Sequence, residues 1–320
     1  MPNNISLKGA RKRYISFGPS NVQVSEVILG TMRIANKTPE EVAELIQTSL
    51  DSGINAVDTA PIYGPSESII GNAFALCPRL RDKVWLQTKL GIRPHPQVKS
   101  NYFDFSYDHI IESVDNSLIA LKTDHIDSLL LHRPDALMEP DEIARAFDEL
   151  KAAGKVIDFG VSNQNPAMMR RLANHFNVPI TANQVQISAA FTPMFDSFFN
   201  VNMEVDAFAM RDGGILEYGA EHNMAIQAWS VLQHGYFGGV FLGDPDYAGL
   251  NKALERIAEE HDSTPTAVAI NWVLRYPAKM QAIVGTTKPE RVRMSAAACD
   301  WEMSREEWYE IYLSAGNKLP

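Results

Sequence analysis

The stretch Ile126-Asp127-Ser128-Leu129-Leu130-Leu131-His132 is a short apolar run that ends in a histidine. Its length and its aliphatic residues predict a buried β-strand. The segment 141–154 follows it with helical periodicity, which predicts an amphipathic helix packed on that strand. A strand followed by a covering helix is the unit of a parallel sheet, so this part of the chain predicts an α/β fold.

The same alternation recurs along the chain. Strands are expected at 27–31, 55–59, 84–89, 126–132, 156–161, 181–187, 225–230 and 281–285. The clearest helices are expected from Thr38 to Gly53 and at 107–122, 141–154, 165–176, 250–261 and 264–276. Thr38 and Thr264 each precede a proline, which is typical of a helix start. Eight such repeats predict a (β/α)8 TIM barrel.

The remaining segments lie around this predicted barrel. Residues 13–26 contain a Gly-Pro-Ser-Asn turn and predict a hairpin that caps one end. The irregular stretches 91–106 and 231–248 follow the third and seventh strands, so they are expected to overhang the catalytic face. The tail 308–320 either contributes to that face or packs as a terminal helix. No linker divides the chain, and we expect residues 1–320 to form a single barrel domain.

Composition limits the classes of function. The chain is 45% hydrophobic and 21% charged, and no apolar run is long enough for a membrane span. Residues 1–6 lack the features of a secretory signal, and only Cys77 and Cys299 are present, which predicts a cytoplasmic protein. A net charge of −10 argues against an extended nucleic-acid surface, although a local basic pocket for a phosphorylated cofactor remains compatible. The histidines lack zinc-type spacing, and no metal site is predicted.

Three predicted strands end in polar side chains, Asp58, Lys89 and His132, and Tyr63 lies five residues beyond Asp58. The carboxyl ends of barrel strands converge on one face, so these residues are expected to meet there. Carbonyl reduction needs a hydride on carbon and a proton on oxygen. Tyr63 could deliver the proton if the ammonium of Lys89, held by Asp58, lowered the pKa of the phenol. A neutral His132 could orient the carbonyl.

Each of these residues also has an ordinary structural interpretation. Tyr63 could be a loop aromatic, Lys89 a solvated strand end, Asp58 a turn cap and His132 a buried histidine with satisfied hydrogen bonds. The motifs around them favour the catalytic interpretation. In order, they are Gly30-Thr31-Met32, Asp58-Thr59-Ala60-Pro61-Ile62-Tyr63-Gly64, Lys89, Leu129-Leu130-Leu131-His132-Arg133-Pro134, Gly160-Val161-Ser162-Asn163 and Asn183-Gln184-Val185.

In this order and over nearly its whole length, the chain resembles the aldo-keto reductases. In particular it is similar to bacterial oxidoreductases in which the histidine is followed by Arg-Pro-Asp, as in His132-Arg133-Pro134-Asp135. The resemblance implies a monomeric or weakly associated barrel that uses a nicotinamide cofactor without metal or flavin. It also implies that Tyr63 is the proton donor, that Lys89 and Asp58 tune it, and that His132 orients the carbonyl.

The resemblance further implies a cofactor site. Ser162, Asn163 and Gln184 would meet the nicotinamide carboxamide, which amide and hydroxyl groups match, and Trp229 would stack on the ring. The segment from Ser230 through Leu232 to Gly235 would approach the pyrophosphate. The full predicted set is Gly30, Thr31, Met32, Asp58, Ser162, Asn163, Gln184, Trp229, Ser230, Leu232, Gly235, Gly285, Thr286, Thr287, Lys288 and Arg291.

Cofactor preference depends on the last motif, which runs from the eighth strand into a helix start where phosphate is favoured. Lys288 and Arg291 are its expected charge partners, and a grip on a 2′-phosphate would favour NADPH over NADH. Two departures from the family pattern weaken this step. Gly285 stands where many members have lysine, and Met294-Ser295 replace the common Glu-Asn that meets adenine.

The sequence is compatible with three functions. The first is NADPH-dependent reduction of an aldehyde or ketone, and the second is oxidation of a sugar or polyol in the same site. The third is a nicotinamide-binding regulatory or sensor subunit with little turnover, which the complete set of catalytic residues disfavours. The small-molecule substrate is not fixed, because the loop 91–106 offers a mixture that suits aromatic, sugar or keto-acid compounds. Its candidates are Ile92, Arg93, His95, Tyr102 and Phe103.

Overall fold

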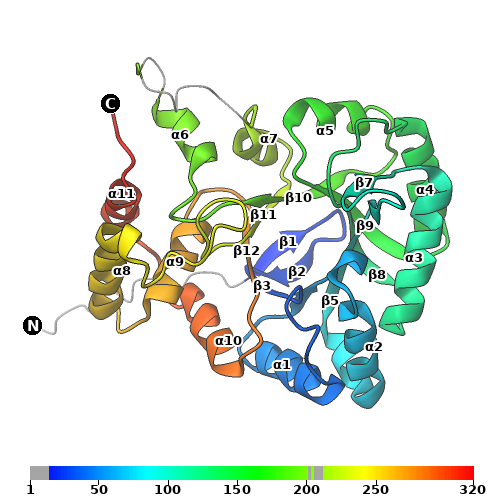
Figure 1. The fold of residues 1–320 in the computed structure, drawn as a ribbon, viewed down its shortest axis with the longest axis horizontal. Helices are drawn as coiled ribbons and strands as arrows, with labels where there is room; N and C mark the ends of the chain where they lie inside the picture. The colour runs from blue at the N-terminus through cyan, green and yellow to red at the C-terminus, as the bar shows by residue number, and fades with distance from the viewer. Residues whose placement is uncertain (1–13, 201–202, 205–211) are drawn as a thin grey trace, which may run out of the picture.

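Eight parallel strands form a closed barrel in the computed structural model, which describes residues 14–200, 203–204 and 212–320 (Figure 1). In chain order they are β3 (Val27–Gly30), β4 (Ala56–Asp58), β5 (Trp85–Leu90), β8 (Ile126–Leu131), β9 (Val156–Ser162), β10 (Ile180–Gln186), β11 (Ala225–Trp229) and β12 (Met280–Val284). Each strand pairs with its sequence neighbour in the ring, and β12 pairs with β3 to close it. The predicted (β/α)8 barrel is confirmed.

Helices surround the ring of strands (Figure 1). The predicted helices are α1 (Pro39–Asp51), α3 (Tyr107–Leu121), α4 (Pro140–Ala152), α5 (Pro166–Ala173), α8 (Ala248–Glu260) and α9 (Pro265–Leu274). The sequence interpretation did not assign α2 (Ser66–Leu76), α6 (Pro193–Phe199) and α7 (Ile215–Glu221), and α10 (Pro289–Ala296) begins where a helix start was expected after the eighth strand. Thr38 forms a capping box with Glu41, which explains where α1 begins. No described helix has the combined length and apolar character of a membrane span.

A hairpin closes the amino end of the barrel, as predicted. Its strands β1 (Tyr14–Phe17) and β2 (Val22–Ser25) pair antiparallel. Phe17 packs edge-on against Trp85 of β5, with ring centres 4.6 Å apart, and both belong to an apolar cluster that fills this end of the barrel. The ammonium of Lys279 donates a hydrogen bond to the carbonyl of Ser16. The carboxyl ends of the strands are therefore the open face.

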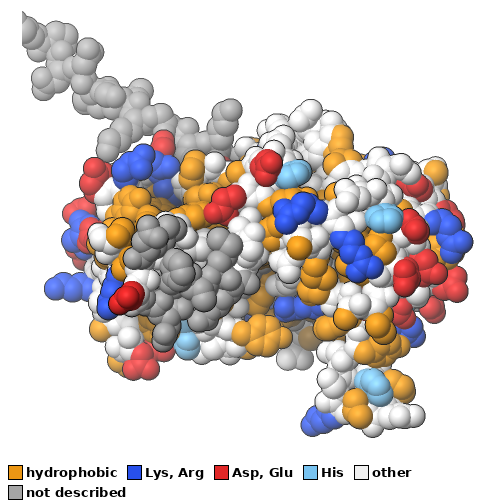
Figure 2. Space-filling model, turned by 90° about the horizontal axis from the view of Figure 1, so that it is seen from above, with side chains coloured by type: hydrophobic (Ala, Val, Ile, Leu, Met, Phe, Trp, Pro, Cys, Tyr) orange, Lys and Arg blue, Asp and Glu red, His pale blue; other side chains and the backbone are white. Residues whose placement is uncertain are grey.

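Two segments outside the barrel contain regular structure. The loop 91–106 contains a second hairpin, in which β6 (Ile92–Pro94) pairs with β7 (Asn101–Phe103). The chain's end forms the helix α11 (Arg305–Ser314), whose Trp308 stacks on Trp272 of α9. Of the two expectations for the tail, packing as a terminal helix is the one observed. On the face in Figure 2, acidic and basic side chains are interspersed without a continuous basic area.

Candidate active site at the carboxyl ends of the strands

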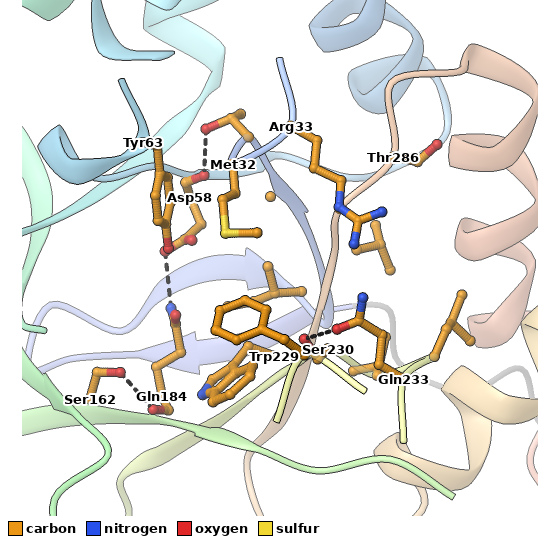
Figure 3. A pocket seen from close by; sticks show the side chains of 18 of the residues that line it. Met32, Arg33, Asp58, Tyr63, Ser162, Gln184, Trp229, Ser230, Gln233 and Thr286 are labelled. Carbon is orange, nitrogen blue, oxygen red and sulfur yellow. Dashed lines mark hydrogen bonds between the residues drawn. The ribbon is translucent and has the colours of Figure 1, made fainter. Parts of the chain in front are cut away.

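A cavity of about 1040 Å³ opens among residues at the carboxyl ends of the barrel strands and in the loops that follow them (Figure 3). Its lining includes fifteen of the predicted site residues: Gly30, Thr31, Met32, Asp58, Tyr63, His132, Ser162, Asn163, Gln184, Trp229, Ser230, Leu232, Gly285, Thr286 and Arg291. Lys89 does not line the cavity because its side chain is fully buried. Gly235, Thr287 and Lys288 also lie outside the lining.

Lys89 joins the predicted catalytic residues to one another. Its Nζ lies 2.6 Å from Oδ2 of Asp58 and 3.3 Å from the hydroxyl of Tyr63. It also donates to the carbonyl of Thr59 at 2.8 Å. The ion pair is almost inaccessible, since the two side chains are 0% and 4% exposed. A buried ion pair of this kind needs such additional hydrogen bonds to offset its desolvation.

The pKa of Tyr63 departs from the sequence prediction. Burial of the phenol raises its pKa above the ordinary value of 10, and the nearby charge of Lys89 opposes that rise without reversing it. The predicted net lowering of the Tyr63 pKa is therefore wrong, although Lys89 acts in the predicted direction. A raised pKa keeps Tyr63 protonated at neutral pH, which is the form that can donate a proton.

His132 and Tyr63 both line the cavity, and their side chains face each other. The two rings meet edge to face, with centres 5.8 Å apart. Burial, followed by the charges of Lys89 and Arg133, holds the pKa of His132 well below its ordinary value of 6.5. The imidazole is therefore neutral at pH 7, the state in which one ring nitrogen donates and the other accepts.

The second oxygen of Asp58 belongs to a buried chain of glutamines. Oδ1 of Asp58 accepts from the amide nitrogens of Gln87 at 2.7 Å and Gln184 at 3.0 Å. Both nitrogens also donate to Oε1 of Gln227, and the amide nitrogen of Gln227 donates to Oε1 of Gln87. Gln227 then donates to Gln281, and Gln281 donates to the carbonyl of Ser25 in the capping hairpin. This glutamine chain thus connects the floor of the barrel to the predicted catalytic carboxylate.

The residues predicted to hold the nicotinamide carboxamide already bind one another. Ser162 donates to the carbonyl of Gln184, and the amide nitrogen of Asn163 donates to Oγ of Ser162 and the carbonyl of His132. Trp229 donates through Nε1 to Oδ1 of Asn163. Among the described residues, these bonds and those to Asp58 leave Oε1 of Gln184 as an acceptor for a carboxamide N–H. These residues therefore offer an acceptor for the carboxamide N–H, whereas their amide and hydroxyl donors are already used within the protein.

The loop after β11 is folded tightly. Ser230 has a positive φ of 54° and its hydroxyl donates to Gln233. Oγ of Ser188 donates to the carbonyl of Gln233, and Gln186 donates to that of Gly235. The carbonyl of Gly235 therefore contacts the barrel wall. Ser230 and Leu232 line the cavity as predicted, and Gly235 supports the loop without lining it.

The side of the cavity that lies next to the end of β12 and the start of α10 carries the residues that fit a phosphate. Thr286 and Arg291 line it, and Arg291 lies in the first turn of α10, where the helix N-terminus favours an anion. Lys288 is the N-cap residue of α10. Figure 3 shows the side chain of Arg33 directed into the cavity on the side where Thr286 lies. The sequence interpretation missed Arg33 because it stopped at Met32, one residue earlier.

Several other lining residues were not predicted. They are Ile62, Asn101, Arg133, Val231, Gln233, Tyr236, Phe237, Val240, Leu242, Thr266, Ile283, Val284, Met294 and Ser295. Of the five substrate candidates in the loop 91–106, Ile92 lines the cavity, and Arg93, His95, Tyr102 and Phe103 do not. Ile92, Asn101 and the exposed rings of Tyr236 and Phe237 come from the two loops that were expected to overhang this face. Arg133 had been noted only as part of a motif. Within the ranges that the structure describes, no group of three or more His, Cys, Asp or Glu side chains could hold a metal ion.

Comparison with known proteins identifies relatives over almost the whole chain. The model of the aldo/keto reductase family matches residues 26–312. A 6-dehydroglucose reductase of Agrobacterium fabrum is 36% identical over 93% of this chain and 96% of its own. Oxidoreductase YdhF of Escherichia coli is 34% identical over 94% and 97%. The crystal structure of a thermostable aldo-keto reductase, Tm1743, has the same fold, with a TM-score of 0.74 and 24% identity over 94% and 99% of the two chains.

Proposed function

Because the chain belongs to the aldo/keto reductase family of oxidoreductase enzymes, we propose that it reduces an aldehyde or ketone to the alcohol with NADPH. In this proposal Tyr63 gives its proton to the carbonyl oxygen. Lys89 and Asp58 stabilise the phenolate that remains, and neutral His132 orients the carbonyl. A relative named 6-dehydroglucose reductase supports carbonyl reduction as the direction.

The observation that carries the proposal is the position of Lys89. Its ammonium contacts the Tyr63 hydroxyl at 3.3 Å and is anchored to Asp58 at 2.6 Å. When Tyr63 loses its proton, the new negative charge forms beside a cation that is already fixed in place, so little reorganisation is needed. An ordinary structural lysine at a strand end would extend into solvent, whereas this one is fully buried.

Family members use a nicotinamide cofactor, and in the proposed reaction it supplies the hydride. Trp229 offers a ring face to the nicotinamide, and Oε1 of Gln184 can accept from its carboxamide. Arg33, Thr286 and Arg291 would hold the phosphates. Two arginines on this side of the cavity support the preference for NADPH, with Arg33 and Arg291 replacing the predicted pair of Lys288 and Arg291.

A spectrophotometric screen of NADPH oxidation against aldehydes, ketones and dicarbonyls tests the reaction class. We expect turnover in the wild type, and Tyr63→Phe should lower kcat by about a hundredfold or more because the proton donor is lost. Tyr14→Phe in the capping hairpin is the matched control and should keep full activity. Tight NADPH binding without turnover of any carbonyl would instead identify a sensor subunit.

A further inference from the structure

Arg133 is a cation at the mouth of the cavity without an acidic partner. It follows His132 directly, and its Cζ lies 5.5 Å from the ring centre of Trp229 and 5.6 Å from that of Tyr236. Within the described part of the chain, no hydrogen bond or ion pair joins Arg133 to a carboxylate. The two rings hold the guanidinium by cation–π contacts and leave its N–H groups available to a ligand.

Arg133 lies across the barrel from the arginine assigned to the cofactor. It follows β8, whereas Arg291 follows β12, and three strands separate β8 from β12 in either direction around the ring. Arg33 follows β3, the direct neighbour of β12. Phosphates bound by Arg33 and Arg291 would therefore lie on the side of β3 and β12, whereas the guanidinium of Arg133 lies beside Trp229, which would meet the nicotinamide end of the cofactor. The charge of Arg133 remains for a second ligand.

The proposed chemistry takes place beside Arg133. Its charge contributes to lowering the pKa of His132 and opposes the rise in the pKa of Tyr63, so it acts on both groups that would contact the carbonyl. The whole chain carries a net charge of −10, which repels anions at long range. The half-buried cation of Arg133 therefore opposes, beside the reacting groups, the negative field of the whole protein.

We propose that the physiological substrate is a carbonyl compound that carries a carboxylate, which Arg133 binds while the carbonyl lies between Tyr63 and His132. This inference rests on the proposed function and adds the substrate class. The planar guanidinium matches a carboxylate through two parallel hydrogen bonds. The reaction itself is unchanged: the carbonyl carbon gains the hydride, its oxygen gains the proton of Tyr63, and the carboxylate remains ionised.

The experiment compares pairs of substrates in which a carboxylate is replaced by its neutral methyl ester. Succinic semialdehyde is measured against its methyl ester, and 4-carboxybenzaldehyde against methyl 4-formylbenzoate, each with NADPH. We expect the wild type to prefer the acid of at least one pair by roughly tenfold in kcat/KM, the size of one charge-assisted contact. Arg133→Leu should remove this preference, and Arg133→Lys should retain part of it. Arg256→Met removes a cation that is paired with Glu260 and Glu310 outside the cavity lining, and it should leave the preference intact.

The outcomes separate this inference from the proposed function. If the esters are reduced as well as the acids, and Arg133→Leu changes neither ratio, the substrate class is wrong while carbonyl reduction stands. If no compound of either kind is reduced, the proposed function fails and the inference fails with it. Unchanged NADPH binding by Arg133→Leu confirms that the variant is folded and that Arg133 does not serve the cofactor. A parallel loss of NADPH affinity would assign Arg133 to the cofactor and overturn the inference.

Discussion

The ammonium of Lys89 lies 2.6 Å from the carboxylate of Asp58, in a place that solvent does not reach. The contact between Lys89 and Asp58 serves two purposes. It fixes a cation under the Tyr63 hydroxyl, and it satisfies a carboxylate that burial would otherwise strongly disfavour. Stability and the proposed catalysis therefore depend on the same two side chains.

Lys89→Met should lower the free energy of unfolding by about 3–5 kcal/mol, because it leaves the carboxylate of Asp58 buried without its counter-charge. Urea denaturation measures the loss. The double variant Asp58→Asn with Lys89→Met should recover part of it, since no charge then remains. Lys155→Met breaks an exposed ion pair with Asp115 and should cost less than about 1 kcal/mol. Equal costs at the two lysines would contradict this account.

His132 should make stability depend on pH. Its pKa is lowered in the folded protein, so the unfolded chain takes up a proton as the pH falls below 6.5 while the folded protein does not. Stability is therefore lost toward acid, by up to about 1.4 kcal/mol per pH unit. Relative to His132→Asn, the wild type should lose stability below pH 6.5 and show a constant difference above pH 7.5. The control His175→Asn, at an exposed histidine, should leave the loss of stability below pH 6.5 unchanged.

Gln87→Met should cost about 1–3 kcal/mol although the two side chains have similar volumes. The substitution removes a donor to Asp58 and to Gln227 and leaves buried acceptors with fewer partners. Gln47→Met, on the exposed face of α1, is the matched control and should change stability by less than about 0.5 kcal/mol. A neutral result at Gln87 would mean that the glutamine chain does not support the carboxylate.

Arg291→Met should weaken NADPH binding by about tenfold or more and NADH binding much less, because only NADPH carries the 2′-phosphate. Quenching of tryptophan fluorescence measures both dissociation constants. Arg293→Met removes a charge from the same helix outside the cavity lining, so both affinities should persist. If Arg291→Met weakens the two cofactors equally, Arg291 contacts a part that they share.

The sequence located Asp58, Lys89 and His132 correctly at one face because strand ends converge in any closed parallel barrel. It erred on the pKa of Tyr63, because that value depends on how deeply the phenol is buried, and burial follows from tertiary packing. Gly235 illustrates a second limit. Its motif predicted a ligand contact, but its carbonyl accepts a hydrogen bond from Gln186. No local pattern shows whether a loop residue faces the cavity or the wall.

Arg33 and Arg133 were missed for a related reason. Arg33 lies one residue beyond the motif Gly30-Thr31-Met32, and Arg133 lies within a quoted motif but was given no role. The direction of each side chain into the cavity depends on neighbours far away in the chain. For Arg133 those neighbours are Trp229 at the end of β11 and Tyr236 in the loop that follows, both far from residue 133 in the sequence. The short hairpin in 91–106 was likewise not predicted, because strands of three residues carry little periodicity.

The glutamine chain also has a polarity. Asp58 as a carboxylate only accepts hydrogen bonds, so Gln87 and Gln184 must present nitrogen to it, and their partner Gln227 must present oxygen to both. At the other end, the carbonyl of Ser25 imposes the same condition on Gln281. No amide in the series can turn over alone without placing two like groups in contact. A substitution in the barrel floor must therefore preserve the donor-to-acceptor direction of the glutamine chain as well as the volume of the side chain that it replaces.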